Sequence, residues 1–206
     1  MTLAKVGKAP QANADTNIVV RRMEQYDYSD VAAILQEGMD SGSATFEGQA
    51  PATWEDFSQH RIMSLAFVAE EKTPQQHRIV GWITASPVGP RAVFNGVAED
   101  SVYVSASAAG KGVAGLLLDR LLAEAAAQGF WKLHSTIFPE NSGSIRLHSS
   151  RGFVHAGTFR AMAKMQYGPY SGQWRDAYMM EKILANGPAW SEVHSPESSA
   201  ADLSTQ

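Results

Sequence analysis

The 206-residue sequence contains no cysteine. A chain without cysteine forms no disulfides, has no thiolate metal ligands and cannot use a covalent acyl-cysteine intermediate. The sequence also lacks the run of about 18 apolar residues that would span a membrane, and residues 1–16 lack the apolar core of a signal peptide. Its formal net charge of −4 gives no general excess of basic charge for binding nucleic acid. We therefore expect a soluble, cytoplasmic protein without a membrane or nucleic-acid partner.

Both ends of the chain are poor in large apolar residues. Beyond Leu184 the composition turns to Ser, Ala, Pro and Gly, and Trp190 is the exception. Such segments bury too little apolar surface to offset the entropy lost on ordering. We predict flexible tails over residues 1–16 and 185–206 around a single domain over residues 17–184, which is long enough for a core without disulfide or metal staples.

Apolar periodicity predicts an α/β domain. Strands are expected over residues 18–23, 65–70, 78–86, 99–104, 131–138, 152–160 and 174–184. Helices are expected from Asp27 or Ser29 to Gly38, from Thr53 toward Arg61, over 113–127 and over 142–150. Several strands precede a central loop and helix, and a β-α-β unit follows, which indicates a mixed sheet flanked by helices.

The segment Gly110 to Gly115 reads GKGVAG and has the spacing of a glycine-rich dinucleotide loop. An NAD-binding fold requires an acidic residue about 20 positions later, where residues 135–137 are Ser, Thr and Ile. A phosphate-binding P-loop requires Ser or Thr where Gly112 stands. Both nucleotide interpretations are weak. Two remain: backbone N–H groups at a helix N-terminus that suit a pyrophosphate, or a tight turn without a ligand.

Two blocks of the sequence resemble motifs of the GNAT N-acetyltransferases. The block SVYVSASAAGKGVAGLLLDRLL is similar to the acyl-CoA-binding strand, loop and helix of that family, whose pattern Gln/Arg-x-x-Gly-x-Gly/Ala falls on residues 109–114. The block ENSGSIRLHSSRGF, residues 140–153, is similar to the helix Asn-x-x-Ser/Ala-x-x-Leu-Tyr/His. The resemblance spans about residues 18–184. It implies a mixed, mostly antiparallel central sheet flanked by helices, with acetyl-CoA as co-substrate.

The resemblance also implies which residues bind acetyl-CoA. They are Val102, Tyr103, Val104, Ala109, Gly110, Lys111, Gly112, Val113, Ala114, Gly115, Asn141 and Ser144. Ala109 replaces the Gln or Arg of the family, which should matter little if the loop binds through backbone N–H groups. No metal is expected, because no histidine pair has the spacing of metal ligands.

Shorter stretches, SATFE, EDSVYVS, SIRLH and GQWRD, resemble the phosphinothricin and methionine sulfoximine N-acetyltransferases within that family. This closer resemblance implies Glu99 as general base and His148 as an active-site residue. It also implies a small amino-acid analogue as acceptor, with Arg91 near its α-carboxylate and Phe46 and Phe94 as pocket walls. A homodimer is expected as well. Asn95 replaces an Arg that is common in the subgroup, which puts the substrate pocket in question.

The implied chemistry is direct attack of the amine on acetyl-CoA in a ternary complex. Glu99 would deprotonate the amine, provided that burial raises its pKa. Asp100 should point to the opposite face of the strand, so only one of the two carboxylates is expected to face the site. His148 would protonate or orient the leaving thiolate, or would be a buried structural histidine, and His134 and His155 are interpreted as structural.

Two other functions stay open at this point. The first is acetylation of another amine, such as a polyamine or a peptide N-terminus. The second is a non-enzymatic acyl-CoA-binding module.

Overall fold

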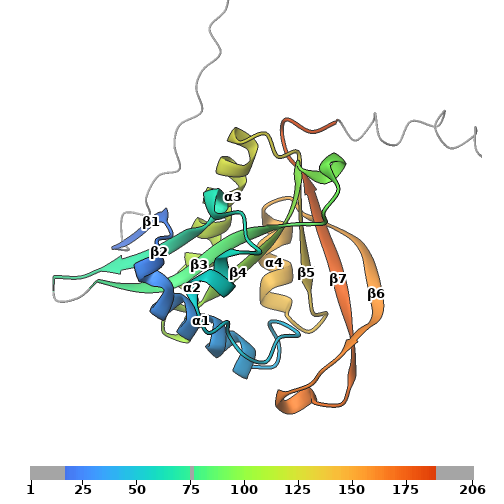
Figure 1. Ribbon diagram of the computed structural model, residues 1–206, viewed down its shortest axis with the longest axis horizontal. Coiled ribbons are helices and arrows are strands. Elements are labelled where there is room, and N and C mark those ends of the chain that lie inside the picture. The colour runs from blue at the N-terminus through green and yellow to red at the C-terminus, as the bar shows by residue number, and fades with distance from the viewer. Residues whose placement is uncertain (1–16, 75–76, 189–206) are drawn as a thin grey trace, which may run out of the picture.

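The computed structural model describes residues 17–74 and 77–188. These residues form one seven-stranded sheet with the strand order β1-β2-β3-β4-β5-β7-β6 (Figure 1). The strands are β1 (Ile18–Arg22), β2 (Phe67–Lys72), β3 (His77–Pro87), β4 (Val97–Val104), β5 (Lys132–Ile137), β6 (Val154–Lys164) and β7 (Trp174–Ile183). Neighbouring strands are antiparallel except β4 and β5, which are parallel. The predicted mixed, mostly antiparallel sheet is therefore confirmed.

Helices cover both faces of this sheet (Figure 1). They are α1 (Tyr28–Asp40), α2 (Trp54–Ser58), α3 (Val113–Ala127) and α4 (Ser142–Ser150). Trp82 and Ile83 are adjacent on β3 and so point to opposite faces. Trp82 packs with α1 and α2 in one apolar cluster, and its Nε1 donates a hydrogen bond of 3.1 Å to the Val31 carbonyl. Ile83 packs with α3 and the partly buried face of α4 in the other cluster. Among the described residues, no helix is long and apolar enough to cross a membrane.

The predicted first and last residues are correct for helices α3 and α4. The predictions for the end of α1 and the start of β2 are wrong, for reasons found in the neighbouring structure. Gly38 does not end α1, which continues to Asp40. A Cβ at Gly38 would lie 2.8 Å from the Tyr103 ring, so this glycine lets a strand residue pack closely against the helix. The second predicted strand, expected from residue 65, begins two residues later as β2, because residues 63–65 form a 3-10 turn. The expectations for residues 1–16 and for Trp190 lie outside the described residues.

The parallel pairing of β4 and β5 is short. It joins Val97–Glu99 to residues 132–134 and then stops. Beyond that point β4 continues its ladder with β3, and β5 continues its ladder with β7. The two strands therefore diverge in the middle of the sheet, and this divergence positions the site.

Candidate active site

A cavity of about 1050 Å³ lies where β4 and β5 diverge. Because the strands separate, the cavity passes from one face of the sheet to the other. On the α1 side it is lined by residues of three segments. They are Glu99, Ser101 and Tyr103 on β4, Thr136 on β5 with Phe138 just after that strand, and Thr45 and Phe46 in the α1–α2 connection. On the α3 side it is lined by alternate residues of the same strands, by the loop before α3 and by α4. We use the names α1 side and α3 side for these two halves below.

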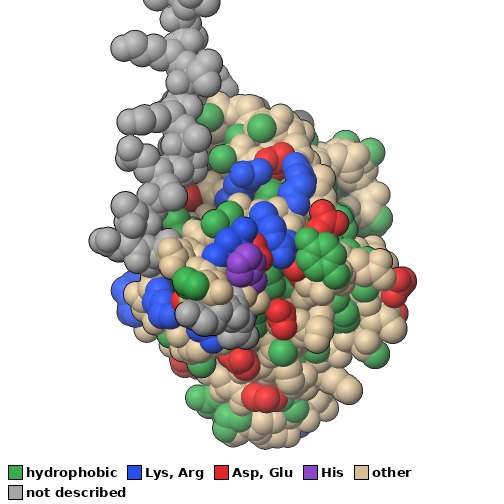
Figure 2. Space-filling view, turned by 90° about the vertical axis from the view of Figure 1, so that its left-hand side faces the viewer, with side chains coloured by type: hydrophobic (Ala, Val, Ile, Leu, Met, Phe, Trp, Pro, Cys, Tyr) green, Lys and Arg blue, Asp and Glu red, His purple; other side chains and the backbone are tan. Residues whose placement is uncertain are grey.

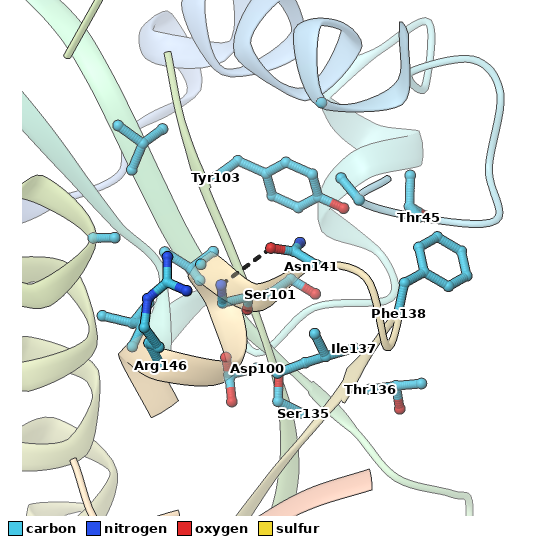
Figure 3. Close-up of a pocket in the computed structure, with 18 of the residues that line it drawn as sticks. Thr45, Asp100, Ser101, Tyr103, Ser135, Thr136, Ile137, Phe138, Asn141 and Arg146 are labelled. Atoms are coloured by element: carbon cyan, nitrogen blue, oxygen red, sulfur yellow. Dashed lines mark hydrogen bonds between the residues drawn. The ribbon is translucent and has the colours of Figure 1, made fainter. Parts of the chain in front are cut away.

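Three aromatic side chains, Phe46, Tyr103 and Phe138, line the α1 side. The rings of Phe46 and Phe138 meet edge to face, with centroids 4.7 Å apart. Tyr103 stacks on the buried Trp82 ring, and its hydroxyl extends toward Thr45 (Figure 3). Burial raises the pKa of Tyr103 to about 12, so its hydroxyl stays protonated. These contacts give a walled pocket that suits a small organic molecule.

Glu99 is the charged residue on the α1 side of the cavity. Its Oε2 lies 3.6 Å from Nε2 of His134, the register partner on β5. Interaction with the His134 side chain lowers the pKa of Glu99, burial opposes this, and a hydrogen bond with Thr136 lowers the pKa further. The net shift is downward. The expectation that burial raises this pKa is therefore wrong, because a partner on the neighbouring strand outweighs desolvation.

Asp100 and His148 form a buried pair on the α3 side. His148 Nε2 lies 3.0 Å from Asp100 Oδ2, and both side chains are fully buried. Burial lowers the pKa of His148, but the hydrogen bond and charge of Asp100 outweigh it, so the pKa is raised. His148 Nδ1 lies 2.8 Å from the Ser144 carbonyl oxygen. With one ring nitrogen facing a carboxylate and the other a carbonyl, the surroundings favour the imidazolium, which donates to both.

This arrangement changes two expectations. His148 is not among the described residues that line the cavity, so its geometry matches the buried structural alternative rather than direct donation to a leaving group. Asp100, in contrast, lines the cavity, and its Oδ1 is buried without a hydrogen-bond partner among the described residues. The expectation that only one of Glu99 and Asp100 faces the site fails, because the cavity is open to both faces of the sheet.

The glycine-rich loop forms the α3-side wall. All residues of the expected coenzyme set except Lys111 line the cavity. Gly110 and Gly112 have positive φ values of 77° and 78°, and a Cβ at either position would meet nothing within 4 Å. Glycine permits this turn, which leads directly into α3 and exposes the N–H groups of its first turn. The loop therefore leaves the backbone at Gly110 and Gly112 accessible next to the N-terminus of α3.

Lys111 points away from the cavity. Its Nζ forms an ion pair of 3.1 Å with Glu71 Oε1, and Arg78 pairs with the same carboxylate. Figure 2 shows the side of the molecule with β1 and the β2–β3 hairpin, where basic side chains lie among acidic ones. The charge of Lys111 is thus partly neutralised by a structural partner.

Two arginines that the sequence analysis did not select also line the cavity, both from the α4 region. Arg146 points toward it from α4 (Figure 3). Arg151 is held by Asp119, with Nε–Oδ1 and Nη2–Oδ2 distances of 3.1 and 3.2 Å. Its guanidinium fills the space that a Cβ at Gly115 would need. They supply positive charge on the side where Ala109 replaces a polar family residue. Their place within and at the end of the helix capped by Asn141 is the signal that the sequence offers.

The structure does not bring Arg91 and Phe94 to the cavity. Both are exposed, and the Arg91 Cζ lies 5.5 Å from the Phe94 ring centroid. They precede Val97, the first residue of β4, whereas the cavity opens from Glu99 toward the other end of the strand. Phe46, the third expected substrate residue, does line it. Within residues 17–74 and 77–188, no group of three or more acidic or histidine side chains is placed to hold a metal ion.

Residues 31–153 match the profile of the acetyltransferase (GNAT) family. The chain is 27% identical over 169 residues to the phosphinothricin N-acetyltransferase of Alcaligenes faecalis, covering 82% of this chain and 83% of that protein. It is 33% identical over 106 residues to the L-methionine sulfoximine/L-methionine sulfone acetyltransferase of Pseudomonas aeruginosa, covering 52% of this chain and 59% of that protein.

A solved structure has the same architecture. It is a GNAT superfamily phosphinothricin acetyltransferase from Sinorhizobium meliloti in complex with AcCoA, with a TM-score of 0.71 and 28% identity. The similarity covers 83% of this chain and 90% of that one.

Proposed function

Since the chain belongs to the GNAT acetyltransferase family and is an acetyl-CoA-dependent N-acetyltransferase, we propose that it acetylates the α-amino group of a small amino-acid analogue. The names of its relatives support acceptors of the phosphinothricin, methionine sulfoximine or methionine sulfone type. The observation that carries the proposal is the position of Glu99. It is a carboxylate at the point where β4 and β5 separate, beside an aromatic pocket.

In this proposal acetyl-CoA occupies the α3 side. Its pyrophosphate lies against the 109–115 loop, where the N-terminus of α3 favours negative charge. Arg146 and Arg151 add positive charge to the same side of the cavity. The pantetheine arm passes along Val102 and Val104 toward the gap between the strands, and Asn141 lines its path. The thioester then reaches the gap from the face opposite to Glu99.

The acceptor amine enters from the α1 side and loses a proton to Glu99. The nitrogen of the free amine attacks the thioester carbon, the new C–N bond forms and the C–S bond breaks. The second proton of the nitrogen passes to the departing thiolate, so that the products are the amide and coenzyme A as its thiol. Direct attack suits a chain without cysteine, and two substrates held on opposite faces of one gap supply the required proximity. The buried Asp100–His148 pair joins α4 to β4 and so fixes these two walls of the α3 side relative to each other.

A second candidate is acetylation of an amine that has no carboxylate. Glu99 is the charged residue on the α1 side among those that line the cavity, and the lining arginines lie on the α3 side. A protonated amine suits an acidic pocket, whereas an α-carboxylate would find no lining guanidinium there. This observation favours a polyamine or simple amine as acceptor. The relative turnover of acceptors with and without a carboxylate is therefore the quantity to measure.

The test is an acetyl-CoA consumption assay with matched acceptors. Phosphinothricin, methionine sulfoximine and methionine sulfone are each compared with the decarboxylated amine, beside a polyamine and a peptide N-terminus. We expect turnover of the amino acids to exceed that of the matched amines. Turnover restricted to amines selects the second candidate, and tight acetyl-CoA binding without turnover of any acceptor in the panel would contradict both candidates.

We also propose that the protein is a cytoplasmic homodimer. Four large apolar side chains are exposed on β6 and β7: Val154, Phe159, Met162 and Trp174, at 52%, 39%, 51% and 65%. β6 is the edge strand at this end of the sheet and β7 is its neighbour, and exposed apolar side chains there suit contact with a second copy. Light scattering that gives the mass of a monomer at working concentrations would contradict the dimer.

A further inference from the structure

His134 shares the last rung of the β4–β5 ladder with Glu99. Partner residues in a ladder project from the same face of a sheet, so both side chains lie on the α1 side. His134 Nε2 lies 3.6 Å from Glu99 Oε2, and it is buried with no hydrogen-bond partner among the described residues. The Glu99 side chain is 39% exposed and that of His134 is 17% exposed. Glu99 therefore stands between the cavity and a buried ring nitrogen.

The base proposed above has a difficulty that this neighbour resolves. A glutamate carboxylate has an ordinary pKa of about 4.3, so it is a weak proton acceptor at neutral pH. An α-amino group has an ordinary pKa of about 7.7–8.0, so transfer of its proton to such a carboxylate is unfavourable. Imidazole is a stronger base than a carboxylate. A second acceptor next to Glu99 would make the overall transfer easier.

Resting on the proposed function, we propose that Glu99 and His134 form a relay in which His134 receives the proton that Glu99 removes from the acceptor amine. The N–H bond of the ammonium group breaks and the proton binds a Glu99 carboxylate oxygen. It then passes from Glu99 to the lone pair of His134 Nε2. Glu99 is again a carboxylate, His134 is an imidazolium beside it, and the free amine attacks the thioester. No further reactant is consumed.

The charges around His134 favour this end state. On β4 it faces Glu99, and on β7 its register partner is Glu181. Lys132, two residues earlier on the same strand and face, forms an ion pair of 2.5 Å with Glu181. The charge of Glu181 is thus matched by Lys132, while Glu99 has no lysine or arginine partner among the described residues. An imidazolium at His134 would be stabilised by the Glu99 carboxylate that hands it the proton.

Two substitutions of His134 separate a relay from mere positioning. His134→Val fits a β-strand and removes the nitrogen. His134→Gln keeps a hydrogen-bond donor that can hold Glu99 but cannot take up a proton at neutral pH. In a relay both variants lower kcat by about tenfold or more at neutral pH, within the range of general base catalysis. The loss shrinks at high pH, where the amine arrives already deprotonated, and the KM for acetyl-CoA stays unchanged.

His155→Val is the matched control. His155 lies on β6, where its ring packs on Tyr178, and it does not line the cavity. We expect wild-type kcat from this variant. Wild-type kcat in His134→Gln would overturn the relay and leave His134 as a positioning residue.

A second measurement does not depend on activity. The carboxyl carbon of Glu99 is titrated by NMR in the wild type and in folded His134→Val. Because His134 is the largest cause of the lowered pKa of Glu99, we expect this pKa to rise in the variant. An unchanged titration would overturn the pairing. Absence of turnover with every acceptor would contradict the proposed function instead, and the titration alone would then decide the pairing.

Discussion

Glu99 and Asp100 are neighbours in the sequence, yet they belong to opposite sides of the same cavity. Glu99 is half-exposed on the α1 side, and its neighbours are an unpartnered ring nitrogen and Thr136. Asp100 is buried on the α3 side, and one of its oxygens is fixed by His148. Strand β4 thus places the accessible carboxylate of Glu99 next to the carboxylate of Asp100, which is buried and paired with His148. In the function proposed above, the α1 side carries out the chemistry and the α3 side holds the coenzyme.

Removing the base from the α1 side should give the largest effect. Glu99→Gln keeps the size and hydrogen bonding of the side chain but removes its basicity. We expect the acetylation rate to fall by about 10² to 10⁴ while acetyl-CoA affinity stays nearly constant. Steady-state kinetics over a pH series checks this, and the rate should recover at high pH. Wild-type rates at neutral pH would remove Glu99 from the mechanism.

Breaking the buried pair should act on stability rather than on chemistry. Asp100→Asn leaves His148 buried without its charged partner, and losing one partner of a buried pair costs about 3–5 kcal/mol of unfolding free energy. Because the retained amide oxygen can still accept a hydrogen bond, we expect the lower end of that range. Urea denaturation provides the measurement. A variant as stable as the wild type would show that the pair contributes little.

The same pair predicts the direction of a pH dependence. The folded-state pKa of His148 is raised above its ordinary value of 6.5, so its contribution to stability is fully present below that value. The contribution is lost as the pH rises through the raised folded-state pKa. The stability difference between wild type and Asp100→Asn should therefore shrink with increasing pH. A difference that grows would contradict a raised pKa.

A change in the loop on the α3 side should act on coenzyme affinity alone. Gly112→Ala places a Cβ where backbone is proposed to approach the pyrophosphate, and we expect acetyl-CoA affinity to fall about tenfold, or about 1.4 kcal/mol. Gly129→Ala is the control, because Gly129 also has a positive φ and open space but lies at the far end of α3. Both variants bear similar backbone strain. Equal affinities by calorimetry would contradict the proposed pyrophosphate site.

Arg91→Ala should have the smallest effect. Arg91 is exposed and does not line the cavity, so we expect less than about a twofold change in kcat/KM for any acceptor, well under the 1.4 kcal/mol of a tenfold change. A loss of about 30-fold for an amino acid but not for its decarboxylated amine would place Arg91 at the α-carboxylate after all. That result would also give the α1 side the positive charge that its lining residues lack.

The α3 side could be predicted from the sequence because its parts are local. Each part depends on a few consecutive residues. These parts are the turn at Gly110 and Gly112, the apolar face of α3 and the Asn141 cap of α4. Both helices accordingly have the predicted limits. The GNAT resemblance rests on these same two segments.

The α1 side could not be predicted in this way because it is assembled from distant segments. Phe46 meets Phe138, and Glu99 meets His134, only through strand order and register. The lowered pKa of Glu99 and the buried state of His148 depend on partners more than 30 positions away. The sequence predicts a helix end at Gly38, because the Tyr103 ring that packs on this glycine is equally remote along the chain.

The short β4–β5 ladder leaves two strand edges facing each other without a ladder partner inside the described sheet. Beyond Glu99 and His134, each strand hydrogen-bonds to its outer neighbour along one edge only. Amides on these inner edges should exchange their hydrogens for solvent deuterium faster than the amides that face β3 and β7. A bound coenzyme that fills the gap would then act like an additional strand, and slowed exchange confined to these inner edges would map its position residue by residue.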